Sequence, residues 1–160
     1  MQIAIRHPHL VNKLVLGSAT YKRNGMQPGF FEGMQQATLH HMPQQLQEAF
    51  LKVNPDPQGL QAMFERDVAR MLAFTDIPDE SIKAIEAPAL VINADREVIR
   101  AEHALELSHM LPNAHLLITP GGHGDYIGEI CVADKEGKLP ELVINVMEEF
   151  LGHGWLSTKS

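Results

Sequence analysis

Two short apolar runs separated by one helical segment constrain the fold more than any other feature. Residues 88–94, PALVINA, and residues 115–119, HLLIT, have the length and composition of buried strands. Between them, residues 102–111 place apolar side chains on one helical face, and a Pro-Asn pair ends that helix. A strand–helix–strand unit of this size is typical of a parallel crossover. Because near-continuous apolar strands need cover on both faces, the unit predicts an α/β fold with a parallel sheet.

The two ends of the chain extend this sheet and its cover. Residues 1–6 have the pattern of a helix end, and the following His-Pro pair terminates it, since a residue before proline avoids the helical region. Residues 13–17, KLVLG, then predict a third buried strand, which a Gly-Ser pair closes. Residues 139–151 predict a closing helix with an apolar stripe. About three parallel strands with flanking helices are therefore expected.

Residues 21–87 lack strand patterns and are rich in turn signals. Helices are expected at about 29–40, 43–53 and 57–74. The segment holds five of the eight methionines and five of the six phenylalanines. These flexible apolar side chains favour two interpretations, the core of a helical subdomain or the lining of an adaptable pocket. The candidates for substrate contact are Phe30, Phe31, Met34, Met63 and Met71.

Ionisable side chains follow both late strands. Asp95 and Glu97 come after the strand at 88–94, and His123 lies in the glycine-rich loop that follows the strand at 115–119. Because the carboxyl ends of parallel strands meet at one edge of a sheet, an acid and an imidazole are expected to meet there. An acid that orients an imidazole is two-thirds of a nucleophilic triad. The alternative from spacing alone is that His123 is an ordinary surface residue of a loop.

The stretch PALVINADREVIRAEHALELSHMLPNAHLLITPGGHGDYIGE resembles the C-terminal half of the α/β-hydrolase family. That family has a strand, an acidic loop, a helix opening with Glu-His-Ala, a Leu-Pro-Asn-Ala turn, a last strand and a Pro-Gly-Gly-His-Gly loop, in this order. The start of the chain, MQIAIRHPHLVNKLVLGSA, is similar to the helix after the nucleophile and the sixth strand of the family. The resemblance implies a partial hydrolase core at 1–20 and 88–160, with a helical cap, or lid, at 21–87.

The resemblance also implies roles for the loop residues. His123 matches the catalytic histidine. Glu97 matches the acid that orients it, and Asp95, at the first acidic position of the loop, is the alternative. In such enzymes a serine attacks an acyl carbon, the histidine takes its proton, and the acid steadies the imidazolium. His103, in the first turn of the helix at 102–111, is expected to be structural.

The nucleophile of that family has no counterpart in this sequence. It occupies a Gly-x-Ser-x-Gly elbow after the fifth strand, and the 160 residues contain no such motif. Ser18 and Cys131 do not lie on a strand-to-helix elbow. The chain is therefore expected to be a truncated, C-terminal portion of a serine-type hydrolase for small apolar acyl substrates, with little or no activity alone. The alternative is a non-catalytic fragment that self-associates or binds a partner.

Composition excludes other classes of function. The net charge of −7 and the absence of a basic run argue against nucleic acid or an anionic membrane as partner. No apolar run is long enough to span a bilayer. The nine histidines are scattered without the carboxylate or cysteine spacing that would close a metal shell, so neither a metal nor a cofactor is expected. One cysteine and no signal-peptide pattern suggest a cytoplasmic protein.

The strand at 13–17 predicts self-association. In the family order it would lie beside a fifth strand that this sequence does not contain. Its edge would then be apolar and guarded only by Lys13. A twofold partner that lends the same surface would cover it. We therefore expect a homodimer, or a higher assembly, with residues 1–20 at the interface.

Overall fold

The computed structural model describes residues 1–132 and 136–152. The elements, in chain order, are α1 (Gln2–Arg6), β1 (Leu14–Gly17), α2 (Phe30–Gln35), α3 (Gln44–Val53), α4 (Pro57–Leu72), α5 (Asp79–Lys83), β2 (Ala89–Ala94), α6 (Ala101–Met110), β3 (Ala114–Thr119) and α7 (Leu139–Gly152), with 3₁₀ turns at Pro8–Leu10, Arg23–Gly25, Leu39–His41 and Asp125–Ile127. None of the described helices is both long and apolar enough to cross a membrane.

The sheet has three parallel strands in the order β1-β2-β3. Leu14 pairs with Ala89 and Ala89 pairs with Ala114, so the three strands start in register. All three therefore end at the same edge, which is where the two ionisable loops begin. The prediction of an α/β fold with three parallel strands is confirmed.

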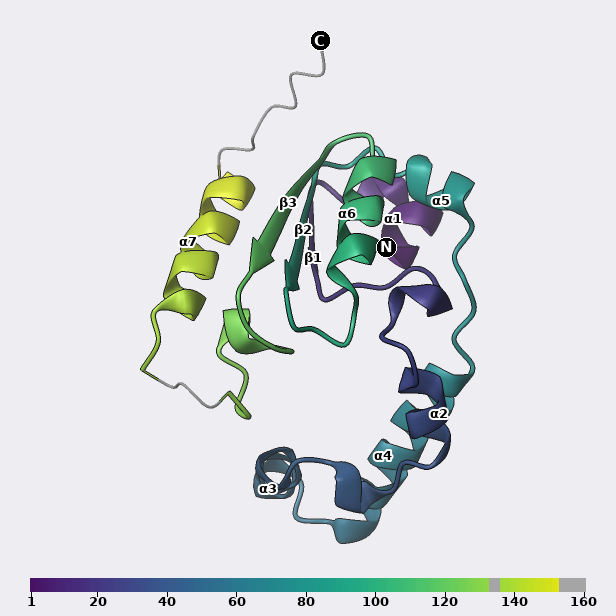
Figure 1. Cartoon of the computed structure of the whole chain (residues 1–160), viewed down its shortest axis with the longest axis vertical. Coiled ribbons are helices and arrows are strands. Elements are labelled where there is room, and N and C mark those ends of the chain that lie inside the picture. The colour runs from purple at the N-terminus through teal and green to yellow at the C-terminus, as the bar shows by residue number, and fades with distance from the viewer. Residues whose placement is uncertain (133–135, 153–160) are drawn as a thin grey trace.

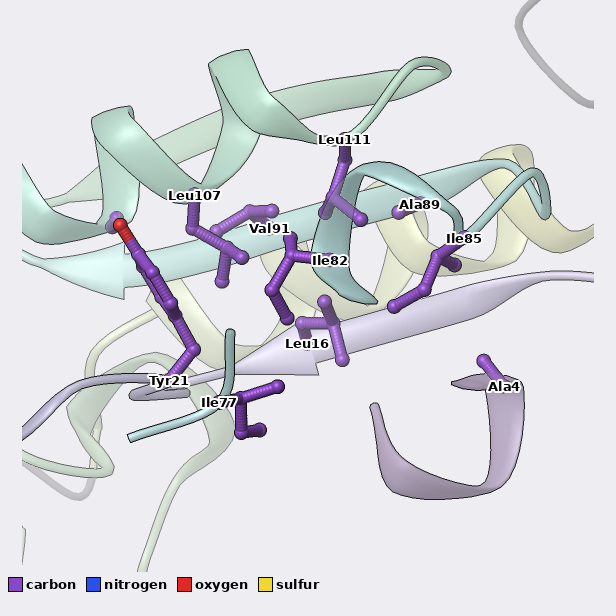
Figure 2. Close-up of a cluster of buried hydrophobic side chains, with 11 residues drawn as sticks. Ala4, Leu16, Tyr21, Ile77, Ile82, Ile85, Ala89, Val91, Leu107 and Leu111 are labelled. Carbon is purple, nitrogen blue, oxygen red and sulfur yellow. The ribbon is translucent and has the colours of Figure 1, made fainter. Parts of the chain in front are cut away.

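Side chains of the strands alternate between two apolar clusters, as the two-residue period of a strand requires. Leu16 and Val91 point into one cluster together with Leu107 of α6, whereas Leu90 and Ile92 point into the other with Phe150 of α7. Helices α1, α5 and α6 lie on one side of the sheet and α7 on the other (Figure 1). Figure 2 shows the first cluster, in which Leu16 and Val91 face Ile82, Leu107 and Leu111. The sheet is thus covered on both faces.

The middle of the chain folds into the helices α2, α3 and α4, which lie beyond the carboxyl ends of the strands in Figure 1. The expected helix at 29–40 is divided, which corrects the prediction. Helix α2 ends at Gln35, and a separate 3₁₀ turn follows at Leu39–His41. The cause is local: Thr38 is extended, and its hydroxyl and backbone N–H both lie 3.0 Å from Nδ1 of His41. That side-chain cap competes with the continuing helix.

The two ends of the 21–87 segment pack on the sheet rather than among the middle helices. Tyr21 and Ile77 both belong to the first apolar cluster, and the N–H of Ile77 donates to the carbonyl of Tyr21 at 2.7 Å. Helix α5, which the sequence did not predict, adds Ile82 to the same cluster. The chain therefore leaves the sheet and returns to it at one place. The cap boundary at 21–87 stays a prediction.

Candidate active site

Two loops at the carboxyl edge of the sheet carry the candidate site. One follows β2 and contains Glu97, and the other follows β3 and contains His123. Two backbone hydrogen bonds hold the loops side by side: Asp95 N–H donates to the Thr119 carbonyl, and Arg96 N–H to the Gly121 carbonyl, both at 2.9 Å. The parallel strands thus bring the two loops together, and the hydrogen-bond ladder of the sheet continues into the loops.

Glu97 and His123 meet directly. Nδ1 of His123 lies 2.5 Å from Oε1 of Glu97. The side chain of Glu97 is fully buried, whereas that of His123 is 61% exposed. A carboxylate accepts hydrogen bonds and donates none, so the proton of the neutral imidazole lies on Nδ1. The other ring nitrogen, Nε2, is then left as a base.

Glu97 is held by two further groups, one on each carboxylate oxygen. Its Oε1 also accepts the N–H of Val98 at 2.9 Å, and its Oε2 accepts the hydroxyl of Ser18 at 2.8 Å. The hydroxyl of Tyr126 in turn lies 2.9 Å from Oγ of Ser18. Both carboxylate oxygens are thereby satisfied, which is the condition for burying a charge without a large cost.

These contacts move the pKa of each partner. Burial raises the pKa of Glu97, but the hydrogen bonds from His123 and Ser18 lower it more, so its pKa lies below the ordinary value. The hydrogen bond to Glu97 raises the pKa of His123, although burial works against it. Near neutral pH the pair therefore holds an ionised acid beside an imidazole that binds protons more readily than a free one.

Asp95 does not approach the imidazole. It is exposed, and its Oδ1 accepts the N–H of Gly121 at 2.9 Å, which fastens the start of the histidine loop. Of the two acids that the sequence offered as partners of His123, the structure brings only Glu97 to the ring.

Glycines shape the loop that presents His123. Gly121 and Gly124 have φ angles of +116° and +76°, a region that side chains disfavour. A Cβ on Gly121 would also lie 2.6 Å from Oδ2 of Asp125, which accepts the N–H of Gly122. The positive φ angles allow the chain to turn on both sides of the histidine.

Sequence reasoning missed Ser18 and Tyr126 as members of this site. The available signal for Ser18 is its Gly-Ser position at the end of a strand beside β2, which lies at the carboxyl edge of the sheet. Tyr126 lies three residues after His123, in the same loop, which was the available signal. The hydroxyl groups of serine and tyrosine do not require an acid as partner, so the positions of Ser18 and Tyr126 in the sequence were only a weak signal.

The apolar candidates for substrate contact lie in the middle helices. Phe30, Phe31, Met34, Met63 and Met71 are all half-buried. The rings of Phe30 and Phe31 meet edge to face, and the guanidinium of Arg23 lies 3.5 Å from the centre of the Phe31 ring. Both phenylalanines also line a cavity of about 370 Å³. Their role in substrate binding stays a prediction.

A short segment links these helices to the acid loop. The N–H of Gln27 donates to the carbonyl of Val98 at 2.8 Å, and its side-chain amide donates to the carbonyl of Glu97 at 3.1 Å. Helix α2 starts three residues later. The segment that leads into α2 is therefore hydrogen-bonded to the loop that carries Glu97. Within residues 1–132 and 136–152, no group of three or more His, Cys, Asp or Glu side chains is arranged to hold a metal ion.

Comparison with known proteins identifies the fold of this chain. No protein-family model and no curated protein matches the sequence. Among solved structures, a meta-cleavage product hydrolase from Pseudomonas fluorescens superposes with a TM-score of 0.63 at 18% identity, over 94% of this chain and 59% of the hydrolase. An α/β hydrolase from a Medee basin deep-sea metagenome gives 0.61 at 18% identity, over 99% and 62%.

A third neighbour is 2-hydroxy-6-oxo-6-phenylhexa-2,4-dienoate hydrolase from a Rhodococcus strain, with a TM-score of 0.59 at 17% identity, over 94% and 59%. The protein therefore has an α/β-hydrolase fold in part. It spans about three-fifths of the length of the hydrolases that it matches.

Proposed function

We propose that His123 and Glu97 are the base and the orienting acid of a serine-type α/β hydrolase. The observation that carries the proposal is the fully buried carboxylate of Glu97, which binds Nδ1 of an exposed imidazole. Such an arrangement fixes the tautomer and leaves Nε2 directed away from the acid, as proton transfer to and from a nucleophile requires.

The chemistry follows from this pair. A serine hydroxyl attacks the acyl carbon of the substrate, and Nε2 of His123 takes the hydroxyl proton. Glu97 stays ionised and stabilises the imidazolium, because its hydrogen bonds hold its pKa below the ordinary value. His123 then gives the proton to the leaving group, and the acyl group stays on the serine. Water attacks this acyl group with the same help from His123, which releases the carboxylic acid product and restores the serine.

The proposed substrate is a small molecule with an apolar acyl group. The support is the half-buried apolar side chains of the middle helices, Phe30, Phe31, Met34, Met63 and Met71, of which Phe30 and Phe31 line a cavity. In this proposal residues 21–87 act as a cap that excludes water from the carboxyl edge of the sheet. One neighbour is named a meta-cleavage product hydrolase, and another is named for a substrate that carries an apolar phenyl group, 2-hydroxy-6-oxo-6-phenylhexa-2,4-dienoate.

The proposed nucleophile lies outside this sequence, because the 160 residues contain no Gly-x-Ser-x-Gly motif. Loss of a triad member leaves only the residual rate that binding and the oxyanion hole support, and a complete triad exceeds it by several orders of magnitude. We therefore expect the 160-residue chain to hydrolyse a chromogenic short-chain ester several orders of magnitude more slowly than a protein with the complete triad.

The test is the coding sequence that precedes Met1. An in-frame Gly-x-Ser-x-Gly motif would allow the longer protein to be expressed and assayed with p-nitrophenyl butyrate. His123→Ala should lower its kcat by about 10³-fold or more, whereas the control His9→Ala, an exposed histidine, should leave it unchanged. If the longer protein hydrolyses no ester, or if His123→Ala is as active as His9→Ala, the hydrolase proposal fails.

A second candidate function is self-association without catalysis. It is favoured by the outer edge of β1, which pairs with no strand in the described part of the chain. A groove of about 900 Å³ runs beside this edge, lined by Ile3, Leu10, Leu14 and Leu151 among others, and Ile3 and Leu10 are 63% and 67% exposed. The ammonium group of Lys13, just before β1, donates to the carbonyls of Phe150 and Leu151 near the end of α7.

We propose that a second copy of this chain covers the edge, with residues 1–20 at a twofold interface. Sedimentation equilibrium should then find a dimer at micromolar concentration, and Leu10→Glu should shift it to monomer. A clean monomer of the unmodified chain would contradict this candidate and leave the hydrolase proposal untouched.

A further inference from the structure

We infer that Ser18 is a positioning residue of the site: its hydroxyl fixes the carboxylate of Glu97 so that the acid holds His123 in the productive orientation. The inference rests on the proposed function for the meaning of that orientation. It stands on the geometry of four side chains from three separate parts of the chain, namely Ser18 after β1, Glu97 after β2, and His123 and Tyr126 after β3.

The direction of each hydrogen bond follows from the chemistry of its partner. The ionised carboxylate of Glu97 only accepts, so the single proton of the Ser18 hydroxyl goes to Oε2. Ser18 then has no proton left for Tyr126, so the phenol of Tyr126 donates to Oγ of Ser18. The result is one ordered chain, from Tyr126 through Ser18 to Glu97, which His123 joins from the opposite oxygen.

The two oxygens of Glu97 are not equally supported. Oε1 receives two donors, the imidazole N–H and the N–H of Val98, whereas the hydroxyl of Ser18 is the one described donor to Oε2. Removing that hydroxyl leaves one oxygen of a fully buried carboxylate without a described donor. The carboxylate would then lose charge stabilisation and be free to rotate, and rotation would carry Oε1 away from His123.

The backbone at Ser18 is shaped for this contact. Ser18 has a φ of +45°, the one positive value among the described residues other than glycine. Its N–H continues the sheet ladder to the carbonyl of Ile92 at 2.9 Å. An unfavourable backbone held by the surrounding structure is a mark of functional sites.

Gly17, the residue before Ser18, supports the same inference. A Cβ on Gly17 would lie 2.6 Å from the hydroxyl oxygen of Tyr126, so any larger residue would displace the tyrosine. The Gly-Ser pair that closes β1 therefore makes room for Tyr126 and turns Ser18 toward Glu97.

Ser18 acts through Glu97 and is not itself a catalytic residue in this account. It binds the carboxylate oxygen opposite the one that holds His123, so it reaches the imidazole only through the acid. A nucleophilic serine would instead have to face Nε2, on the far side of the ring. The proposal thus assigns orientation to Ser18 and leaves proton transfer to His123.

The test is nuclear magnetic resonance of the 160-residue chain, labelled with ¹³C at the glutamate carboxyl carbons and ¹⁵N in the imidazole rings. Two variants, Ser18→Ala and Ser18→Gly, remove the hydroxyl. The first keeps a Cβ at a positive φ and the second relieves it, so a shared effect comes from the hydroxyl and not from the backbone. The control is Ser108→Ala, because Ser108 is a buried serine whose hydroxyl bonds within α6, away from the site.

Both Ser18 variants should raise the pKa of Glu97, because they remove a hydrogen bond to its charged form. In both, the downfield Nδ1–H signal of His123 should broaden or disappear. Ser108→Ala should change neither signal. Tyr126→Phe should raise the Glu97 pKa in the same direction by a smaller amount.

Unchanged Glu97 and His123 signals in both Ser18 variants would overturn the inference, and so would a rise confined to Ser18→Ala. This outcome is separate from the fate of the proposed function, since no step of the measurement depends on activity. If the extended protein fails to hydrolyse esters while the Ser18 effects are found, the hydrolase proposal fails and the positioning of Glu97 by Ser18 stands.

Discussion

Two histidines of this protein each lie beside a glutamate, yet the two pairs are built in opposite ways. In the loop after β3, the acid Glu97 is fully buried and the imidazole of His123 is 61% exposed. In the first turn of α6, the imidazole of His103 is fully buried and the acid Glu106 is 58% exposed, with 3.7 Å between Nδ1 and the nearest carboxylate oxygen.

The surroundings of His103 are those of a packed core. Its ring stacks on Tyr21 with 4.3 Å between centroids, and its Nε2 accepts the N–H of Tyr21 at 3.3 Å. Burial lowers the pKa of His103, whereas the hydrogen bond to Glu97 raises that of His123. The comparison teaches that burial decides which group stays accessible: the ring of His123 is open to a reacting molecule, whereas the ring of His103 is enclosed by its packing and its hydrogen bond.

The largest expected effect comes from a substitution that disturbs the packing of His103. A Cβ on Gly25 would lie 2.4 Å from a ring carbon of His103, so Gly25→Ala should lower the free energy of unfolding by about 1–3 kcal/mol. In the loop that carries His123, a Cβ on Gly122 would lie 3.7 Å from its nearest neighbour. Gly122→Ala should therefore change the free energy of unfolding by about 0.5 kcal/mol or less. Urea unfolding measures both. Equal losses would mean that the two histidine regions are packed alike.

The second effect separates the two acids. Glu97→Gln places an amide N–H₂ among the donors that now serve a buried carboxylate, so at least one buried group loses its partner. The expected loss is about 1–3 kcal/mol in urea unfolding at pH 7. Glu106→Gln is the matched change at the exposed acid and should cost about 0.5 kcal/mol or less. A larger loss for Glu106 would reverse the comparison.

The third and smallest effect is the pH dependence of stability, where the two histidines have opposite signs. The folded pKa of His123 is raised, so its contribution is complete below the unfolded pKa and is lost as the pH rises through the folded value. The folded pKa of His103 is lowered, so its contribution is present above the unfolded pKa and is lost as the pH falls through the folded value.

Urea unfolding of one variant for each histidine at pH 8, 7, 6 and 5 measures the sign of that histidine's contribution to stability. Between pH 7 and pH 5, His103→Gln should lose less stability than the unmodified chain, because it no longer has a ring that resists protonation. His123→Gln should lose more, because it no longer has a ring that gains from protonation. The same change of slope in both variants would refute the assignment of opposite pKa shifts.

The sequence predicted the sheet and the pair of loops because both depend on local patterns. Continuous apolar runs such as PALVINA indicate buried strands, and parallel order brings their carboxyl ends together. The resemblance gave Glu97 as the orienting acid and Asp95 as the alternative, and only the structure shows that Asp95 instead accepts the N–H of Gly121.

Other features depend on contacts distant in sequence. Ser18 and Glu97 are 79 residues apart, and no local signal links them. The break in the expected helix at 29–40 depends on the imidazole of His41 capping Thr38, which competes with helical periodicity. Helix α5 is five residues long and is held by burial of Ile82, so its own pattern was too short to recognise.

The central claim is that Glu97 is ionised, binds the ring of His123 and keeps the proton of the neutral imidazole on Nδ1. The most direct test is a long-range ¹H–¹⁵N spectrum of the imidazole rings across pH 5–9, with signals assigned through His123→Gln and His103→Gln. The account predicts that His123 titrates above the ordinary value of 6.5, that its neutral ring carries the proton on Nδ1, and that His103 titrates below 6.5. A His123 that titrates at or below 6.5, or whose neutral ring carries its proton on Nε2, would contradict it.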